Sequence, residues 1–146
     1  MARKQILCFC HNVETIDHLF FEYRFARIVW FVFHYVSNLA KPINASHLFG
    51  SWIQGLPSNW QHIALLGAAA LCWSLWLGRN DLVFEKKDCS SPLQVIFAAV
   101  HWMRSWAILQ RTDLQDLVME ASHHLARVAM DIFFRAHGWR SSLRIE

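Results

Sequence analysis

Residues that could bind a metal ion are concentrated near the start of the sequence. Cys10 and His18 lie eight positions apart, and the apolar run at 19–21 begins directly after the histidine. Small zinc modules show this kind of spacing, in which a turn carries the first ligands and the start of a helix carries the last. The pattern therefore predicts a metal site that includes Cys10 and His18.

The segment CHNVETIDHLFFEYRFARIVW, residues 10–30, carries a resemblance to a known family. It resembles the zinc-binding domain near the C-terminus of plant LINE-type (non-LTR) reverse transcriptases, in which the ligands follow the pattern Cys-x2-Cys-x7-His-x4-Cys. The resemblance places Cys10 and His18 on the second and third ligand positions. Leu7 and Tyr23 stand at the first and fourth positions, so the chain resembles a degenerate copy of this domain.

Two of the four ligand positions therefore need substitutes if zinc is to bind. Leucine has no ligating atom, and the tyrosine phenol is protonated at neutral pH. Cys8 and His11 are the candidate substitutes, and together with Cys10 and His18 they form a set of four in a shifted register. The alternative is a metal-free segment.

A second segment supports the same resemblance. Residues 71–84 resemble the Trp-x-x-Trp-x-x-Arg-Asn-x-x-Val-Phe element that follows the zinc module in these proteins. Trp73 and Trp76 are three residues apart and share a helix face, and Arg79 follows them. This arrangement suits stacking on the bases of single-stranded nucleic acid. Aromatic residues at helical spacing are more often core residues, and we expect core packing here.

Residues typical of catalytic sites are missing from the sequence. It contains no Asp-Asp pair for polymerase metal ions, no glycine-rich phosphate loop and no His-Glu-x-x-His motif. His123 and His124 are adjacent on a predicted helix and diverge by about 100°, which favours surface histidines. We expect a protein that is not an enzyme.

Composition predicts one folded domain and no secretion. The chain has 146 residues, of which 55% are hydrophobic and 17% charged, and its net charge of +3 comes without a dense Lys/Arg stripe. The start of the sequence is too polar for a signal peptide. We therefore expect an intracellular protein, nuclear or cytoplasmic, whose four cysteines form no disulfide.

The apolar periodicity predicts a mainly α fold of about four to five helices after a small, irregular, zinc-module-like N-terminal segment. The division expected from the resemblance is a module at 1–38 and a helical region at 39–146, although one continuous domain is also consistent. Helix starts and stops are given by capping residues, Pro and Gly, and they include a serine cap with Pro92 at 91–92 and a capping-box pattern at 112–115. The helix at 112–137 has one apolar face, which consists of Leu114, Leu117, Val118, Ala121, Leu125, Val128, Ala129 and Ile132. The predicted helices cover residues 15–37, 47–53, 60–84, 92–110 and 112–137.

Three functions follow from these features. The resemblance implies a non-catalytic remnant of a retrotransposon reverse transcriptase polyprotein, ancestrally associated with nucleic acid. An alternative is a helical protein–protein interaction module that self-associates or binds a partner helix through 112–137, without metal or nucleic acid. A weaker alternative is membrane association through the uncharged run at 63–78, whose 16 residues fall short of the roughly 20 needed to cross a bilayer.

Overall fold

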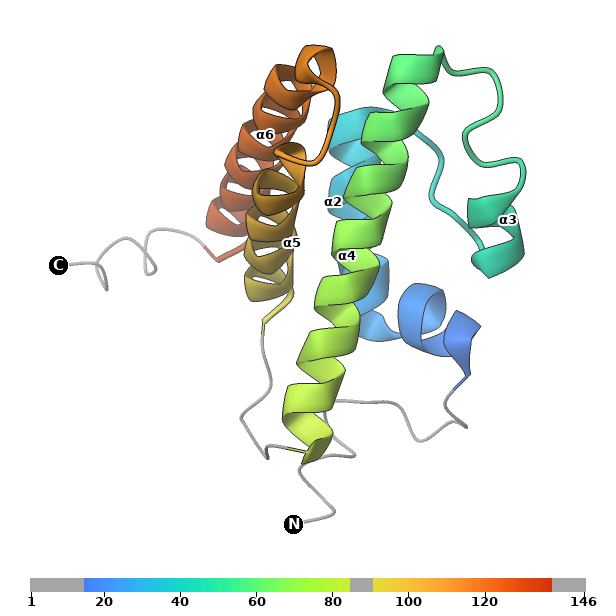
Figure 1. Cartoon of the computed structure of the whole chain (residues 1–146). Coiled ribbons are helices and arrows are strands. Elements are labelled where there is room, and N and C mark those ends of the chain that lie inside the picture. The colour runs from blue at the N-terminus through green and yellow to red at the C-terminus, as the bar shows by residue number, and fades with distance from the viewer. Residues whose placement is uncertain (1–14, 85–90, 138–146) are drawn as a thin grey trace, which may run out of the picture.

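The computed structural model describes residues 15–84 and 91–137 (Figure 1). Within these residues the chain forms six helices and no strand, so the mainly α prediction is confirmed. The helices are η1 (His18–Glu22), α2 (Arg24–Ser37), α3 (Ala45–Phe49), α4 (Ser58–Phe84), α5 (Pro92–Ala107) and α6 (Thr112–His137).

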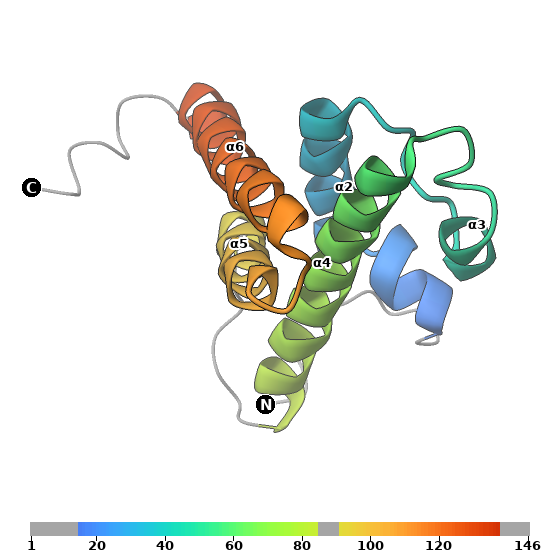
Figure 2. The same cartoon turned by 45° about the horizontal axis from the view of Figure 1, so that its top comes forward.

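Helices α2, α4, α5 and α6 form a bundle around one apolar core (Figures 1 and 2). Helix α5 makes its main contacts with α4 and α6, and α2 packs against all three. The core spans both the early and the late part of the chain, and its largest fully buried side chains include Trp30, Leu71, Ile96, Leu114 and Val118. Burial of these side chains supplies the main driving force for folding.

The single helix expected at 15–37 is interrupted, which corrects the prediction. Tyr23 has an extended backbone (φ −61°, ψ 145°) and separates the π-helix η1 from α2. The Tyr23 amide donates to the carbonyl of His18, and the Tyr23 carbonyl accepts from the amide of Arg27. Tyr23 thereby closes one helix and begins the next, so the apolar pattern continues across a break that periodicity alone does not reveal.

Local capping explains two of the later boundaries. The Ser91 hydroxyl accepts from the amide of Gln94, the Gln94 side chain accepts from the amide of Ser91, and Pro92 is the first residue of α5. This start agrees with the serine cap and proline expected there. Helix α3 covers 45–49 and not 47–53, because the Asn44 side chain accepts from the amide of His47 and so begins the helix earlier.

The capping box expected at the start of α6 is wrong, although α6 itself spans the predicted residues 112–137. The side chain of Gln115 does not fold back onto Thr112. Its amide group donates instead to the carbonyl of Gln110 at 3.0 Å and to that of Ile108. These bonds fix the turn between α5 and α6.

Helices α2 and α4 approach each other closely at Gly67. A Cβ atom at this position would lie 2.8 Å from Cε2 of Phe33, so a side chain here requires the ring or the helix to move. Around this contact, aromatic rings pack edge to face: the ring centroids of Trp30 and Phe33 lie 5.6 Å apart, and those of Trp30 and Trp52 lie 6.1 Å apart. This aromatic cluster joins α2 to the segment after α3.

Helix α4 contains the uncharged run at 63–78. Residues 58–81 are long and apolar enough to cross a membrane, and in the bundle 44% of the most apolar window of this segment is buried. A core helix of a soluble protein meets the same criteria of length and composition. The helix is therefore consistent with the membrane alternative but gives it weak support.

Candidate metal site

The predicted metal ligand His18 opens the π-helix η1, where its backbone is held from both sides. The His18 amide donates to the hydroxyl of Thr15 at 3.0 Å, and the His18 carbonyl accepts from the amide of Tyr23 at 2.8 Å. These bonds fix the direction in which the imidazole leaves the backbone. The local structure thus gives the imidazole of His18, a candidate metal ligand, a defined direction at the start of the helical bundle.

The two ring nitrogens of His18 have different environments. Nδ1 lies 3.3 Å from the carboxylate oxygen Oε2 of Glu22, one helical turn later. Nε2 is buried and has no hydrogen-bond partner among the described residues, and the side chain as a whole is only 12% exposed. A buried polar atom left without a partner lowers the stability of a folded protein by about 1–3 kcal/mol. A partner for Nε2, such as a metal ion, would remove this cost.

The contact with Glu22 also selects the tautomer of His18. A carboxylate only accepts hydrogen bonds, so in the neutral ring this contact assigns the proton to Nδ1 and the lone pair to Nε2. Histidines that bind metals show this arrangement, in which the second nitrogen donates to a carboxylate that orients the ring. Sequence reasoning missed Glu22, and its spacing of four residues from His18 is the signal that could have found it.

The other predicted ligands cannot be placed beside His18. Cys8, Cys10 and His11, together with Leu7, lie outside the described residues. Among the residues that the structure describes, no group of three or more His, Cys, Asp or Glu side chains is arranged to hold a metal ion. The structure therefore leaves the other members of the predicted ligand set untested.

Tyr23, at the position of the fourth family ligand, is a core residue. Its side chain is 4% exposed, and its ring stacks on Phe25 with the centroids 5.5 Å apart. The neighbouring apolar run is also covered, because Phe21 is buried and lies 6.0 Å from the ring of Trp30. The aromatic residues after His18 thus anchor η1 in the bundle.

The comparisons with known proteins gave no match: none of the protein-family models, curated proteins or solved structures compared with this chain matches it.

The Trp-Trp-Arg element on α4 is more exposed than expected. Trp73 and Trp76 are 42% and 39% exposed, so the prediction that both are core residues is wrong. Trp73 meets the edge of Trp102 on α5 at 6.2 Å, and the guanidinium of Arg79 lies 5.5 Å from the ring of Trp76. Trp102 of α5 therefore covers only part of the Trp73 ring, and both tryptophans line a pocket that opens to the surface.

Cys72 lies beside this aromatic patch and lines an apolar surface pocket with Phe20, Trp73, Trp76 and Trp106. Burial raises the pKa of the Cys72 thiol to about 12, because the apolar surroundings disfavour the charged thiolate. The thiol is therefore protonated at neutral pH. This agrees with the role of a small apolar residue and not with that of a nucleophile or metal ligand.

The adjacent histidines of α6 are surface residues, as expected. His123 and His124 are both exposed, and Nδ1 of His123 lies 2.7 Å from the carbonyl of Met119 on the preceding turn. The apolar face predicted for α6 is turned inward, where Leu114, Val118, Leu125 and Ala129 are buried. A partner helix would thus have to use another face of α6.

Proposed function

We propose that this chain is a non-catalytic module derived from a LINE-type retrotransposon reverse transcriptase, in which zinc fixes the N-terminal segment to the helical bundle through His18. One observation carries this proposal: Nε2 of His18 is buried and has no hydrogen-bond partner within residues 15–84 and 91–137, while Nδ1 lies 3.3 Å from the carboxylate of Glu22. The resemblance of residues 10–30 to the zinc-binding domain agrees with it.

In this proposal Nε2 of His18 and the thiolate of Cys10 are two of the zinc ligands. Cys8 and His11 are the residues that would complete a set of four in place of Leu7 and Tyr23. Structural zinc prefers four nitrogen and sulfur ligands, and its binding free energy adds directly to the stability of the folded chain. The ion would therefore act as a cross-link between the first residues and η1.

Thermal unfolding of the metal-free protein, followed by calorimetry at increasing zinc concentrations, tests the proposal. Wild-type protein should bind zinc with a thermal stabilisation that grows with the zinc concentration. Cys10→Ala and His18→Asn should each remove this stabilisation, while His62→Asn should keep it, because His62 is an exposed histidine whose Nδ1 lies 2.8 Å from the carbonyl of Ser58. Equal zinc responses in all four proteins would contradict the assignment.

The ancestral association with nucleic acid finds support in the exposed rings of Trp73 and Trp76 beside Arg79. Base stacking on aromatic faces is tolerant of sequence, and a nearby guanidinium adds attraction to phosphate or base. Fluorescence anisotropy with a labelled single-stranded oligonucleotide tests this role. The double variant Trp73→Leu/Trp76→Leu should weaken binding, and Trp60→Leu, which changes an exposed tryptophan at the other end of α4, should not.

A second candidate function, a protein–protein interaction module, is favoured by a different observation. Met130 and Phe134 lie four residues apart on α6 and are 43% and 38% exposed, outside the face that α6 buries in the bundle. Exposed apolar pairs of this kind suit contact with another helix. Sedimentation velocity should then show concentration-dependent self-association that Met130→Lys/Phe134→Lys abolishes. A monomer at all concentrations would argue against self-association through α6.

A further inference from the structure

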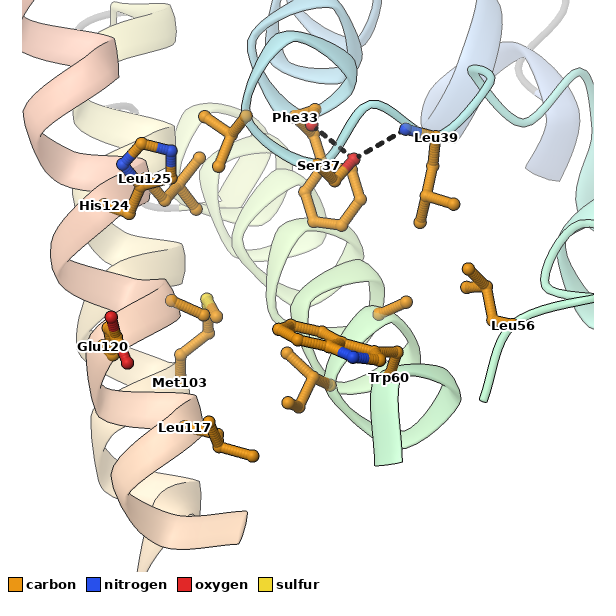
Figure 3. Close-up of a pocket in the computed structure, with 14 residues that line it drawn as sticks. Phe33, Ser37, Leu39, Leu56, Trp60, Met103, Leu117, Glu120, His124 and Leu125 are labelled. Carbon is orange, nitrogen blue, oxygen red and sulfur yellow. Dashed lines mark hydrogen bonds between the residues drawn. The ribbon is translucent and has the colours of Figure 1, made fainter. Parts of the chain in front are cut away.

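A cavity of about 570 Å³ lies between the C-terminal end of α2, the first turns of α4 and the middle of α6 (Figure 3). Phe33 closes it from α2, Trp60 and Ile63 from α4, and Leu117 and Leu125 from α6. Its volume falls within the roughly 300–1,000 Å³ typical of small-molecule sites. The cavity is remote in sequence from the candidate metal site and does not depend on it.

The walls of this cavity are almost entirely apolar, and its few polar groups differ in whether they already make hydrogen bonds within the protein. The hydroxyl of Ser37 is already used, because it donates to the carbonyl of Phe33 at 2.7 Å and accepts from the amide of Leu39 at 3.2 Å. Figure 3 shows both bonds. An apolar body can therefore enter the cavity without breaking a hydrogen bond of Ser37.

Glu120 provides the one charged group of the lining. Its carboxylate makes no hydrogen bond or ion pair with any other residue that the structure describes, and the same holds for His124 one turn later on α6. A carboxylate without a partner at the rim of an apolar cavity attracts a cation, and because Glu120 is exposed, water moderates this attraction. The same charge repels phosphate groups and carboxylates.

An aromatic face lies across the cavity from this carboxylate. Trp60 extends from the start of α4 towards α6, with Met103 and Leu117 on the facing side (Figure 3). The indole of Trp60 is 53% exposed, so a ligand can reach its ring. Tryptophan is the aromatic residue that attracts organic ammonium groups most strongly. Carboxylate and indole together define a preference for positive charge on an apolar body.

We propose that this cavity binds a small organic cation whose apolar body enters between Phe33, Trp60 and Leu125 and whose ammonium group faces Glu120. Three features select this class over others: the volume suits a small molecule and not a polypeptide, the lining is apolar, and its only charge is negative. Nucleotides and fatty acids are disfavoured by the same charge. The site is thus distinct from any surface that would contact nucleic acid.

The experiment compares three probes of one shape: 4-phenylbutylammonium, 4-phenylbutanol and 4-phenylbutyrate. Binding is followed by NMR of protein with 13C-labelled methionine methyl groups, because Met103 lines the cavity and is 2% exposed. The Met103 methyl signal should shift with all the probes that bind. The ammonium probe should bind roughly tenfold more tightly than the alcohol, and the carboxylate probe most weakly.

Glu120→Gln tests the charged contact. Since Glu120 is exposed and unpaired among the described residues, this variant should fold as the wild type does. It should lose most of the preference for the ammonium probe and keep the affinity for the alcohol, whereas Asp131→Asn, which changes an exposed carboxylate on α6 outside the cavity lining, should change neither. The proposal is overturned if the Met103 signal responds to none of the probes at millimolar concentration, or if wild-type protein binds alcohol and ammonium equally well.

Discussion

Nδ1 of His18 lies 3.3 Å from the carboxylate of Glu22, while Nε2 of the same ring is buried and has no hydrogen-bond partner among the described residues. A carboxylate on the second ring nitrogen raises the basicity of a histidine ligand and holds the ring in one orientation. The contact depends only on the short helix η1, because His18 and Glu22 are its first and last residues. His18 is therefore a candidate ligand on two grounds: its position in the motif and the orientation of its ring.

Glu22→Gln should weaken zinc binding without abolishing it. The amide can no longer accept the Nδ1 proton with a full negative charge, and loss of such outer partners typically lowers metal affinity by about 10–100-fold. Competition with a coloured zinc chelator measures the change. Glu120→Gln is the matched control, because it removes a carboxylate on α6 that does not contact His18. An unchanged affinity in Glu22→Gln would show that this contact does not orient a ligand.

Gly67→Ala should destabilise the bundle. The added methyl group would lie 2.8 Å from Cε2 of Phe33, so the ring or the helix must shift, which costs about 1–3 kcal/mol in the free energy of unfolding. Gly78→Ala in the same helix is the control: nothing lies within 4 Å of its added Cβ, and helix propensity should stabilise the protein by up to about 1 kcal/mol. Urea denaturation of both variants measures the difference. Equal effects would contradict the close approach of α2 and α4.

Trp30→Phe should lower the free energy of unfolding by about 2–4 kcal/mol. The indole Nε1 of Trp30 donates to the carbonyl of Phe20 at 2.7 Å, and the side chain is 2% exposed. The variant loses this bond and leaves a void in the core. Trp60→Phe, at a 53% exposed position, should change stability little. Thermal or urea denaturation separates the two, and a neutral Trp30→Phe would argue against η1 being fixed to α2 in this way.

The thiol of Cys72 should be unreactive in the folded protein. Burial raises its pKa from 9.0 to about 12, so at pH 8 its thiolate fraction falls by about 1,000-fold relative to the unfolded chain. Iodoacetamide labelling followed by peptide mass spectrometry should modify Cys72 only after addition of denaturant. Rapid labelling of Cys72 in the native state would contradict its apolar environment.

The same pKa shift gives a stability prediction at alkaline pH. Between pH 9 and about 12 the unfolded thiol releases its proton while the folded thiol keeps it, so deprotonation favours the unfolded state. The contribution of Cys72 to stability is therefore present below pH 9 and is lost as the pH rises. Cys72→Ala should show a shallower decline in the free energy of unfolding over this range. Identical pH profiles would exclude the shift.

Most of the helices could be predicted from the sequence because their ends depend on neighbouring residues. Ser91 and Pro92 begin α5, and α6 ends at His137, one residue before Gly138. The break at Tyr23 could not be predicted, because the apolar pattern continues through it and the extended backbone depends on a hydrogen bond to His18. Local signals specify starts and stops, but a π-helix inside a periodic pattern leaves no such signal.

The candidate sites were predictable to different degrees. Spacing and resemblance singled out His18, whereas the burial of its Nε2 depends on how η1 packs against the bundle. The exposure of Trp73 depends on where α5 crosses α4, which helical periodicity does not determine. The cavity beside Glu120 and Trp60 brings together residues 60 positions apart in the sequence, so only the tertiary structure reveals it.

A metal count per folded chain decides whether zinc binds Nε2 of His18, the buried nitrogen that has no partner among the described residues. Protein purified without chelator should contain roughly one zinc per chain by inductively coupled plasma mass spectrometry, and the His18→Asn and Cys10→Ala variants close to none. The His62→Asn control should keep the wild-type content. Wild-type protein that folds with no zinc, even after incubation with zinc, would contradict the claim.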